Sequence, residues 1–290
     1  MPAADASAPA IAVVIPCFND GATLSDAVRS VQAQDRIDEL VVVDDGSTDP
    51  RTIEVFGSLE REGVRVVHRS NGGLGAARMT GVLATSADYV FCLDADDRLL
   101  PGALSALSEA LDGDSRLALV WGDYLLFGER EWRQLTAPSL DPWQISYQND
   151  TPASVLIRRS ALLAAGGWQL RGGYEDWDLL MALAERGEHG RRVPIIAYEY
   201  RQHGVRMLGE SAARHGELHA LLRSRHPSLF ADRRRSRRRS DAPWALRLLL
   251  PVIFALPVGP NRQRLLAGAA CHLARRRGVC LLLERVRSGA

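Results

Sequence analysis

Two aspartates one residue apart, Asp94 and Asp96, come directly after a short apolar run, and Asp97 follows them. Carboxylates at this spacing, where a strand ends and the chain turns, can converge on one Mg²⁺ or Mn²⁺ ion whose remaining ligands are phosphate oxygens and water. The alternative is a turn rich in aspartate, because this residue also ends strands where no metal is bound. Under the first interpretation, the segment predicts a divalent cation beside a phosphate group.

A second acidic loop, Asp44-Asp-Gly-Ser-Thr-Asp49, also ends an apolar run. One of its carboxylates could accept a hydrogen bond from a nucleotide base or a ribose. The alternative is a plain turn in which Ser47 or Asp49 caps the helix that follows. Under either interpretation the loop lies at the end of a strand.

A glycine-rich loop runs from Asn71 to Arg78 and offers backbone amides and an arginine at the start of a helix. This geometry suits phosphate binding. Gly73 and Gly75 also form a G-x-G after a strand, with Asp94 about 20 residues further on, as in a dinucleotide-binding fingerprint. The third glycine of that fingerprint is missing, and the loop follows the third expected strand instead of the first. A nicotinamide- or flavin-binding oxidoreductase is therefore the rival enzyme class.

An acid pair, Glu175 and Asp176, opens an expected helix next to Trp177. Acids at a helix N-terminus stabilise it by about 0.3–1 kcal/mol without any catalysis. The functional interpretation is a general base in a cleft beside an aromatic wall. Arg201 and His203 follow the last expected strand and could reach a diphosphate or a metal.

Other residues with possible chemistry are assigned structural roles. His215 and His219 are four residues apart but lack a third ligand, so we interpret them as surface polar residues.

The four cysteines show no C-x-x-C spacing, and Cys17 and Cys92 lie inside apolar runs. Buried, reduced cysteines fit a cytosolic chain. The first ten residues lack the basic segment of a secretory signal and are expected to be a disordered leader.

A scaffold must bring these loops together. Short apolar runs alternate with segments of helical periodicity, and continuously apolar strands need burial on both faces. This pattern predicts an α/β chain with a mostly parallel sheet and helices on both sides, where ligands bind beyond the carboxyl ends of the strands. Strands are expected over residues 11–18, 40–43, 64–68, 89–93, 117–121 and 194–200, and helices around 24–31, 52–59, 76–84, 103–111, 175–186 and 206–226.

Charge divides the chain in two. The net charge is only +1, from 36 basic and 35 acidic residues. Residues 231–290 contain 14 arginines and 3 acids (+11), so the other 230 residues, with 22 arginines and 32 acids, carry −10. An acidic body and a basic tail are expected to have different functions.

Every basic residue is an arginine, and the sequence contains no lysine. This excludes a Schiff-base lysine, a lysine base and the lysine of a phosphate-binding loop. Any phosphate that the protein binds must therefore be neutralised by arginine or by a metal ion.

The order of these motifs resembles that of the family-2 glycosyltransferases, which have the glycosyltransferase A (GT-A) fold, a Rossmann-like sheet flanked by helices. The resemblance covers roughly residues 11–205. The segments that carry it are Val13-Val-Ile-Pro-Cys-Phe-Asn19, Val43-Asp-Asp-Gly-Ser-Thr-Asp49, Asn71 to Arg78, Leu93-Asp-Ala-Asp-Asp97, Gly173-Tyr-Glu-Asp-Trp-Asp178 and Tyr200-Arg-Gln-His203.

The resemblance implies roles for residues that would bind the nucleotide. Pro16, Phe18 and Asp45 would hold the base, usually uracil. Arg78 would lie near the base and the phosphates, and Asp94 would contact the ribose side.

The resemblance also implies roles in the chemistry. Asp96, with His203 nearby, would bind the Mn²⁺ or Mg²⁺ ion that bridges the diphosphate. Asp176 would be the catalytic base, and Glu175 would shape the acceptor site. Two more side chains are expected to contact the donor or the acceptor, namely Trp177 and Arg201.

Two departures from the family's pattern are visible. Met79 stands where the family often has asparagine, and Arg206-Met207 stands where it often has small hydroxyl residues. The first affects the hydrogen bonds of the glycine-rich loop, and the second affects the final loop over the site.

The implied function is inverting transfer of a sugar from a nucleotide-sugar donor, with UDP as the expected nucleotide, to an acceptor hydroxyl. The acceptor is expected to be a glycan or a lipid-linked glycan of the bacterial cell surface. The alternatives are the oxidoreductase and a non-catalytic module that binds sugar nucleotides. No nucleic-acid partner is expected.

Residues 231–290 are expected to form a helical, basic, amphipathic extension after a glycosyltransferase domain over 11–230. Residues 233–239 are almost all arginine and predict a linker or surface patch, and the apolar run 248–258 is too short to span a membrane, which takes about 20 residues. The mixture of basic and apolar residues suits docking of 232–290 on an anionic membrane surface. Packing on the enzyme body is the rival. The expected location is cytoplasmic, at the inner face of the plasma membrane.

Overall fold

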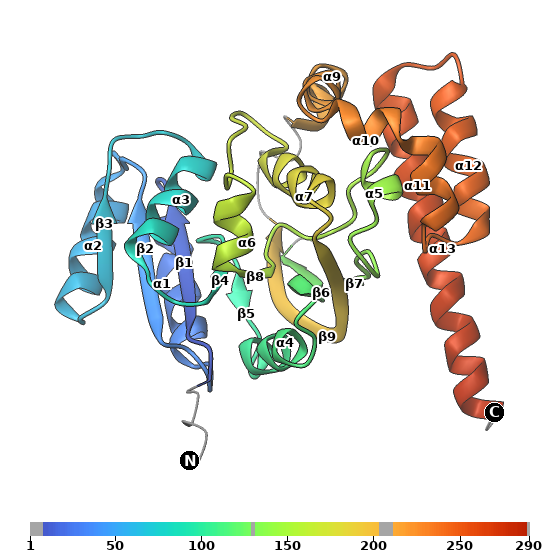
Figure 1. Ribbon diagram of the computed structural model, residues 1–290. Coiled ribbons are helices and arrows are strands. Elements are labelled where there is room, and N and C mark those ends of the chain that lie inside the picture. The colour runs from blue at the N-terminus through green and yellow to red at the C-terminus, as the bar shows by residue number, and fades with distance from the viewer. Residues whose placement is uncertain (1–7, 129–130, 203–210, 289–290) are drawn as a thin grey trace, which may run out of the picture.

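The computed structural model of the chain describes residues 8–128, 131–202 and 211–288, with side chains of the last helix described as far as Arg275. The strands in these residues form one sheet in the order β3-β2-β1-β4-β8-β6-β9-β5, with β7 paired to β6 (Figure 1). The strands are β1 (Ile11–Cys17), β2 (Glu39–Asp44), β3 (Arg65–His68), β4 (Tyr89–Cys92), β5 (Arg98–Leu99), β6 (Leu117–Gly128), β7 (Trp132–Gln134), β8 (Leu156–Arg158) and β9 (His189–Gln202).

The helices follow the alternation that the sequence predicts. They are α1 (Gly21–Gln32), α2 (Pro50–Arg61), α3 (Leu74–Ala84), α4 (Ala103–Asp112), α5 (Pro142–Ile145), α6 (Arg159–Ala164), α7 (Glu175–Glu185), α9 (His215–Arg225), α10 (Pro227–Ala231), α11 (Arg233–Arg239), α12 (Trp244–Ala255) and α13 (Pro260–Ser288). Part of the helix expected over 206–226 lies outside the described residues.

The sheet has two parts that differ in strand direction. β3, β2, β1 and β4 are all parallel, as expected from their apolar runs. The short strand β8 joins them to the other part and is antiparallel to both β4 and β6. β6 and β9 are longer than expected and pair in parallel. The GT-A-like half that carries the acidic loops therefore has the predicted topology.

Each face of the sheet has its own hydrophobic core. Alternate residues of β1 point to opposite sides, so Val14 belongs to one cluster and Val13 and Ile15 belong to the other. Helices α3, α6 and α7 pack against the first face, while α1, α2 and α4 pack against the second. Burial on both faces explains why every residue of β1 is apolar or proline.

The C-terminal helices pack on the body through a third core. Trp143 and Tyr147, at α5, contact Leu246 and Leu250 of α12 and Cys271 of α13. Figure 1 shows α11, α12 and α13 gathered beside α5 at one end of the molecule. The arginine run expected to be a linker is helix α11. In the part of the chain that the structure describes, no helix is both long enough and apolar enough to cross a membrane.

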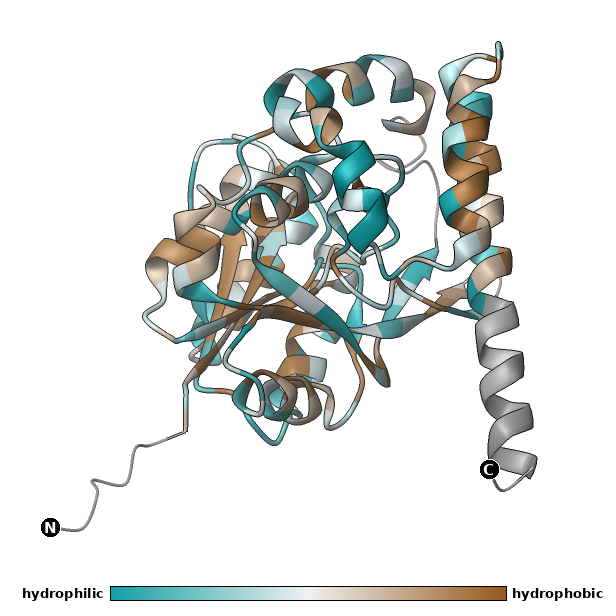
Figure 2. Cartoon of the chain, turned by 45° about the vertical axis from the view of Figure 1, so that its right-hand side comes forward, coloured by the Kyte–Doolittle hydropathy of each residue, from teal (hydrophilic) through white to brown (hydrophobic). Residues whose placement is uncertain are grey.

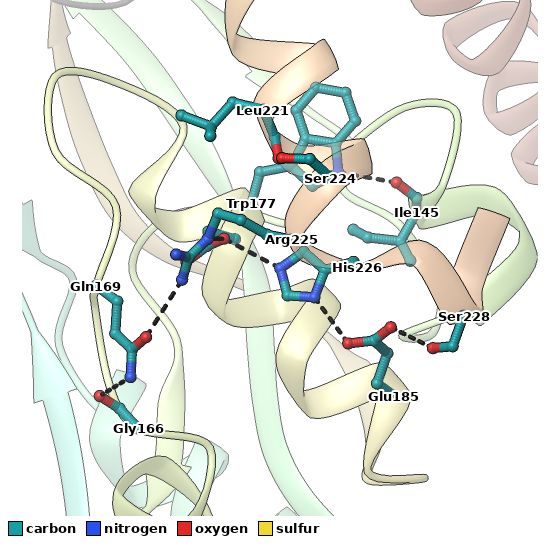
Figure 3. Close-up of polar contacts among 11 residues, drawn as sticks. Ile145, Gly166, Gln169, Trp177, Glu185, Leu221, Ser224, Arg225, His226 and Ser228 are labelled. Carbon is teal, nitrogen blue, oxygen red and sulfur yellow. Dashed lines mark hydrogen bonds and ion pairs between the residues drawn. The ribbon is translucent and has the colours of Figure 1, made fainter.

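A polar cluster fixes the segment between α9 and α10 on α7 (Figure 3). Arg225 donates to both carboxylate oxygens of Asp178, at 2.6 and 3.0 Å. The ring of His226 lies between Asp178, at 3.0 Å, and Glu185, at 2.8 Å. Ser228 of α10 also binds Glu185. This cluster positions the chain that leads from the sheet to the C-terminal helices.

Candidate active site

A pocket of about 530 Å³ lies beyond the carboxyl ends of β1, β2 and β4, where sheets of this kind bind ligands. Segments far apart in the sequence form its wall, from the loops after β1, β2, β3 and β4, the turn before α7 and the end of β9. Its lining residues include Pro16, Phe18, Asp45, Gly72, Gly73, Asp94, Asp96, Leu170, Glu175, Tyr200 and Arg201.

Asp45 organises the glycine-rich loop. Its Oδ1 accepts hydrogen bonds from Arg69, at 2.6 Å, and from the backbone N–H of Gly72, at 3.0 Å. Its Oδ2 accepts the N–H of Gly73, at 2.7 Å. The expectation that these two amides are available for a phosphate is therefore not met here, because the carboxylate of Asp45 already accepts them.

The remaining acids of the same loop have structural roles. Asp49 caps α2 by accepting the N–H of Thr52 at 2.9 Å, as the capping alternative predicts. Asp44 accepts the N–H of Ser47, at 2.7 Å, and pairs with His68, at 2.9 Å. Burial acts to raise the pKa of Asp44, but the hydrogen bonds from His68 and Ser47 outweigh it and lower the pKa.

Arg78 bridges the carboxylates of Asp94, which lines the pocket, and Asp176, which comes from the start of α7. One terminal nitrogen donates to Asp94 at 2.8 Å, and the other donates to Asp176 at 2.7 Å. Only 1% of the arginine side chain is exposed, against 27% of Asp94 and 23% of Asp176. The indole N–H of Trp168 donates to the same oxygen of Asp176 at 2.8 Å. Arg78 and Trp168 therefore hold Asp176 in one orientation.

The acid pair at the start of α7 is electrostatically unusual. Glu175 lines the pocket. Its neighbour Asp176 is not among the lining residues and is hydrogen-bonded to Arg78. Burial raises the pKa of Glu175, and the charge of Asp176 raises it further. Burial also raises the pKa of Asp176, although the charge of Arg78 opposes this effect. Acids with raised pKa values in a pocket are suited to proton transfer near neutral pH.

The far rim of the pocket is formed by the end of β9. The backbone N–H of Arg201 donates to Asp97 at 3.0 Å, and its Nε donates to the carbonyl of Asp96 at 2.9 Å. The guanidinium group lies 4.6 Å from the centre of the Phe127 ring. Asp97 is buried, and burial together with the charges of Asp94 and Asp96 raises its pKa well above the usual value. These contacts fix Arg201 beside the acidic loop.

The pocket offers few side chains that could bind a divalent cation. Among the residues that the structure describes, no group of three or more His, Cys, Asp or Glu side chains could hold a metal ion. Asp94 and Asp96 line the pocket, and Asp94 also binds Arg78. Mg²⁺ usually takes one or two carboxylates and completes its shell with phosphate and water, so this donor set fits such an ion together with a diphosphate. His203, the other expected ligand, lies outside the described residues.

Three expectations for aromatic and histidine side chains are wrong. Trp177 does not form a wall of the pocket: it is buried, and its indole N–H donates to the carbonyl of Ile145 at 2.8 Å. His215, expected at the surface, is buried and pairs with the hydroxyl of Tyr174 at 2.9 Å. His219 is partly buried near Trp177. Burial lowers the pKa of both histidines to about 4.

The two cysteines in the apolar runs are as expected. Cys17 and Cys92 are buried and free. Burial raises the pKa of each thiol to about 12, so neither is a nucleophile at neutral pH.

Sequence reasoning missed several residues that shape the site. Trp168 and Arg69 bind the acids Asp176 and Asp45, and neither had been assigned a role. Leu170 lines the pocket from the turn before α7. The one signal in the sequence is Gly75 of α3, because a Cβ at this position would lie only 3.0 Å from the Cβ of Trp168.

The chain was compared with known protein families. Residues 12–163, slightly more than half of the sequence, match the model of glycosyl transferase family 2. The chain belongs to this family. The resemblance read from the motifs is thereby confirmed, and the family-2 assignment removes the oxidoreductase as an interpretation of Gly73 and Gly75.

Two curated relatives illustrate the range of the family. The GalNAc(5)-diNAcBac-PP-undecaprenol beta-1,3-glucosyltransferase of Campylobacter jejuni is 34% identical over 123 residues, which cover 41% of this chain and 39% of that protein. The Pre-mycofactocin glycosyltransferase of Mycobacterium tuberculosis is 30% identical over 239 residues, covering 76% of this chain and 49% of that protein. The family-2 chain described here thus spans less than half the length of either relative.

A solved structure supports the fold. The chain is similar to TarS of S. aureus, residues 1–349, in complex with UDP-GlcNAc. The TM-score is 0.61 at 16% sequence identity, and the match covers 74% of this chain and 66% of that one. This likeness confirms the expected GT-A fold for the family-2 chain.

Proposed function

We propose that this family-2 member is an enzyme that transfers a sugar from a nucleotide-sugar donor to an acceptor hydroxyl. The observation that carries the proposal is a pocket that brings together the residues at three strand ends with Glu175, whose neighbour Asp176 is hydrogen-bonded to Arg78. Asp45, Asp94, Asp96 and Glu175 all line it. Such a pocket has acids for a metal–diphosphate group on one side and for a proton transfer on the other.

We propose UDP as the nucleotide of the donor. Pro16 and Phe18 line the pocket, and Phe18 is 48% exposed, so its ring offers a face for the base. Asp45 holds the glycine-rich loop by accepting the N–H groups of Gly72 and Gly73, and it would also accept an N–H of the base. The solved TarS complex holds UDP-GlcNAc, which makes a UDP-linked sugar the first donor to test.

In the proposed reaction Asp176 removes the proton of the acceptor hydroxyl. The resulting oxygen attacks the anomeric carbon from the face opposite the diphosphate, a new C–O bond forms, and the bond from that carbon to the diphosphate oxygen breaks with inversion. Arg78 orients Asp176 through a 2.7 Å hydrogen bond, and its positive charge favours the ionised form of the acid. Glu175, at the pocket surface, would contact the acceptor, and Arg201 would contact the donor or acceptor from the far rim.

The proposed cation is Mn²⁺ or Mg²⁺, held by Asp96 and, beyond the described residues, His203. When bound, it would supply positive charge that stabilises the departing diphosphate. Arginine is the other source of positive charge, because the sequence has no lysine.

The proposed acceptor is a glycan or lipid-linked glycan, and the proposed setting is envelope glycan synthesis at the cytoplasmic face of the membrane. The similar Campylobacter protein carries the name of an enzyme that acts on an undecaprenol-linked glycan.

The proposal is tested by incubating the full chain with a panel of UDP- and GDP-sugars and Mn²⁺ and measuring release of the nucleoside diphosphate. We expect one UDP-sugar to be hydrolysed slowly without an acceptor, and hydrolysis to stop when Mn²⁺ is removed with a chelator. Binding of a UDP-sugar by calorimetry without turnover would indicate a non-catalytic module. Neither binding nor turnover across the panel would reject the proposal.

A further inference from the structure

Large apolar side chains are exposed unevenly over the molecule. Of thirteen such side chains with high exposure in the described residues, eight lie between Trp244 and Leu273. In Figure 2 the helices at the edge of the molecule carry brown, hydrophobic segments among teal and white ones. The acidic body, in contrast, has only scattered exposed apolar residues, and these are normal for a soluble surface.

Helix α12 is apolar on two opposite faces. Its inner face, with Leu246, Leu250 and others, is buried against α5 and α13. Its outer face presents Trp244, Leu248 and Val252, one turn apart, with exposed fractions of 71%, 53% and 58%. A helix that is hydrophobic all round is usually covered on all sides. The outer face therefore lacks a covering partner among the described residues.

Arginines flank this outer face. A groove of about 570 Å³ between α11 and α12 is lined by Arg234, Arg237, Arg238, Trp244, Arg247 and Leu248. In the described part of the chain, none of these four arginines forms an ion pair with an acid. The exposed apolar stripe and a cluster of uncompensated positive charge thus share one surface, which we call the α11–α12 face.

Other arginines of the same region pack against the body and differ in this respect from the arginines of the α11–α12 face. The Arg233 guanidinium lies 3.8 Å from the centre of the Tyr147 ring and 4.4 Å from that of Phe230, and burial lowers its pKa to about 10. Arg275 pairs with Asp150 at 2.7 Å. Packing therefore accounts for Arg233 and Arg275 but leaves the arginines of the α11–α12 face unexplained.

We propose that the α11–α12 face docks on the surface of an anionic lipid bilayer. Interfacial helices insert an apolar face with Trp and Leu at the headgroup level, while basic residues beside it bind anionic headgroups. Trp244 and Leu248 supply the first feature and the groove arginines supply the second. The docking does not require the proposed transferase activity, but it would bring the pocket close to a lipid-linked acceptor.

A second copy of the chain is a poorer occupant of this face. A two-fold dimer brings the same patch of both subunits together. The groove arginines would then face one another without an acid to neutralise them, and this like-charge contact is unfavourable. An anionic bilayer complements both the charge and the apolar stripe.

The test is cosedimentation of the full chain with vesicles of equal parts phosphatidylglycerol and phosphatidylcholine, and with vesicles of phosphatidylcholine alone. We expect binding to the anionic vesicles that weakens as salt is raised. The double variant Arg237→Gln/Arg238→Gln and the single variant Trp244→Ser should each lower vesicle affinity about tenfold or more. Helix α2 supplies controls on the acidic body, Arg51→Gln/Arg61→Gln and Ile53→Ser, because both arginines are exposed and Ile53 is 52% exposed.

The outcomes separate the alternatives. Absence of binding to the anionic vesicles, or equal loss in the α2 controls, would overturn the proposal. A chain that is dimeric in size-exclusion chromatography and becomes monomeric in Trp244→Ser would assign the face to a second copy instead. Hydrolysis of the donor in vesicle-free solution is measured on the same variants and should be unchanged. This assay tests the proposed transferase activity alone, and the vesicle assay tests the docking alone.

Discussion

Arg78 of α3 and Arg237 of α11 are the same type of side chain in two contrasting surroundings. Arg78 is 1% exposed and donates to two carboxylates that come from different segments of the chain. Arg237 belongs to a helix without a buried residue and lines a groove with three other arginines. In the acidic body, arginine organises acids that the protein itself supplies. On the α11–α12 face, the groove arginines form no ion pair with an acid of the described residues.

The strongest test of the pocket side is replacement of the proposed base. Asp176→Asn should lower kcat by about 10²- to 10⁴-fold, because a positioned base contributes this much, while donor binding measured by calorimetry stays close to that of the wild type. Glu175→Gln is the matched variant. A larger loss in Glu175→Gln than in Asp176→Asn would assign the base to Glu175, the pocket-lining member of the pair.

The contrast between Arg78 and Arg237 is tested by measuring the unfolding free energy of a variant at each position. Arg78→Met removes one partner of a buried ion pair and leaves Asp94 and Asp176 without it, so the free energy of unfolding should fall by about 3–5 kcal/mol. Arg237→Gln should change it by no more than about 0.5 kcal/mol. Urea unfolding followed by tryptophan fluorescence measures both, and equal losses would contradict the contrast.

The two faces of α12 offer a similar test. Leu250 is fully buried, whereas Leu248 is 53% exposed two residues before it. Leu250→Ala should cost about 2–5 kcal/mol of unfolding free energy through the cavity that it leaves. Leu248→Ala should cost less than about 0.5 kcal/mol. If both variants unfold like the wild type, α12 is not packed on the body in solution.

The smallest expected effect concerns the cluster that connects the two regions. Burial acts to lower the pKa of His226, but the hydrogen bonds with Asp178 and Glu185 outweigh it and raise the pKa above its ordinary value of 6.5. The protonated ring is therefore stabilising, fully so below pH 6.5, and this contribution is lost as the pH rises through the raised pKa.

We expect the difference in unfolding free energy between the wild type and His226→Asn to shrink by about 1 kcal/mol from pH 6 to pH 9. The measurement is urea unfolding at a series of pH values. A difference that is constant, or that grows with pH, would show that His226 is neutral in the folded protein.

The fold of the parallel half of the sheet, formed by β3, β2, β1 and β4, follows from local patterns. The run Ile11–Cys17 is apolar throughout, and such a strand has few places other than the centre of a parallel sheet covered on both faces. Because the carboxyl ends of these strands lie together, the loops that begin at Asp45 and Asp94 had to meet at one pocket. The family assignment and the GT-A fold were therefore predictable, while the roles of the individual site residues stay predictions.

Features that depend on long-range packing were not predictable. Glu175 and Trp177 are two residues apart on α7 and point in nearly opposite directions, so both could not face the pocket. One of the two partners of Asp176 is Trp168, which comes from a loop with no periodic pattern. In the basic extension, composition identifies the arginine run, but only the packed structure separates Arg233, which lies against the Tyr147 ring, from the arginines that line the groove.

The hydrogen bond between Arg78 and Asp176 joins residues that are 98 positions apart in the chain. A contact of this sequence separation closes a long loop, and its entropic cost is recovered only when the elements in between are in place. The parallel half of the sheet, formed by β3, β2, β1 and β4, can therefore form before the pocket does. We expect refolding to proceed in that order, with the proposed base brought into position among the last steps, so that a nascent chain ending before α7 would fold its strands without the proposed catalytic acid pair.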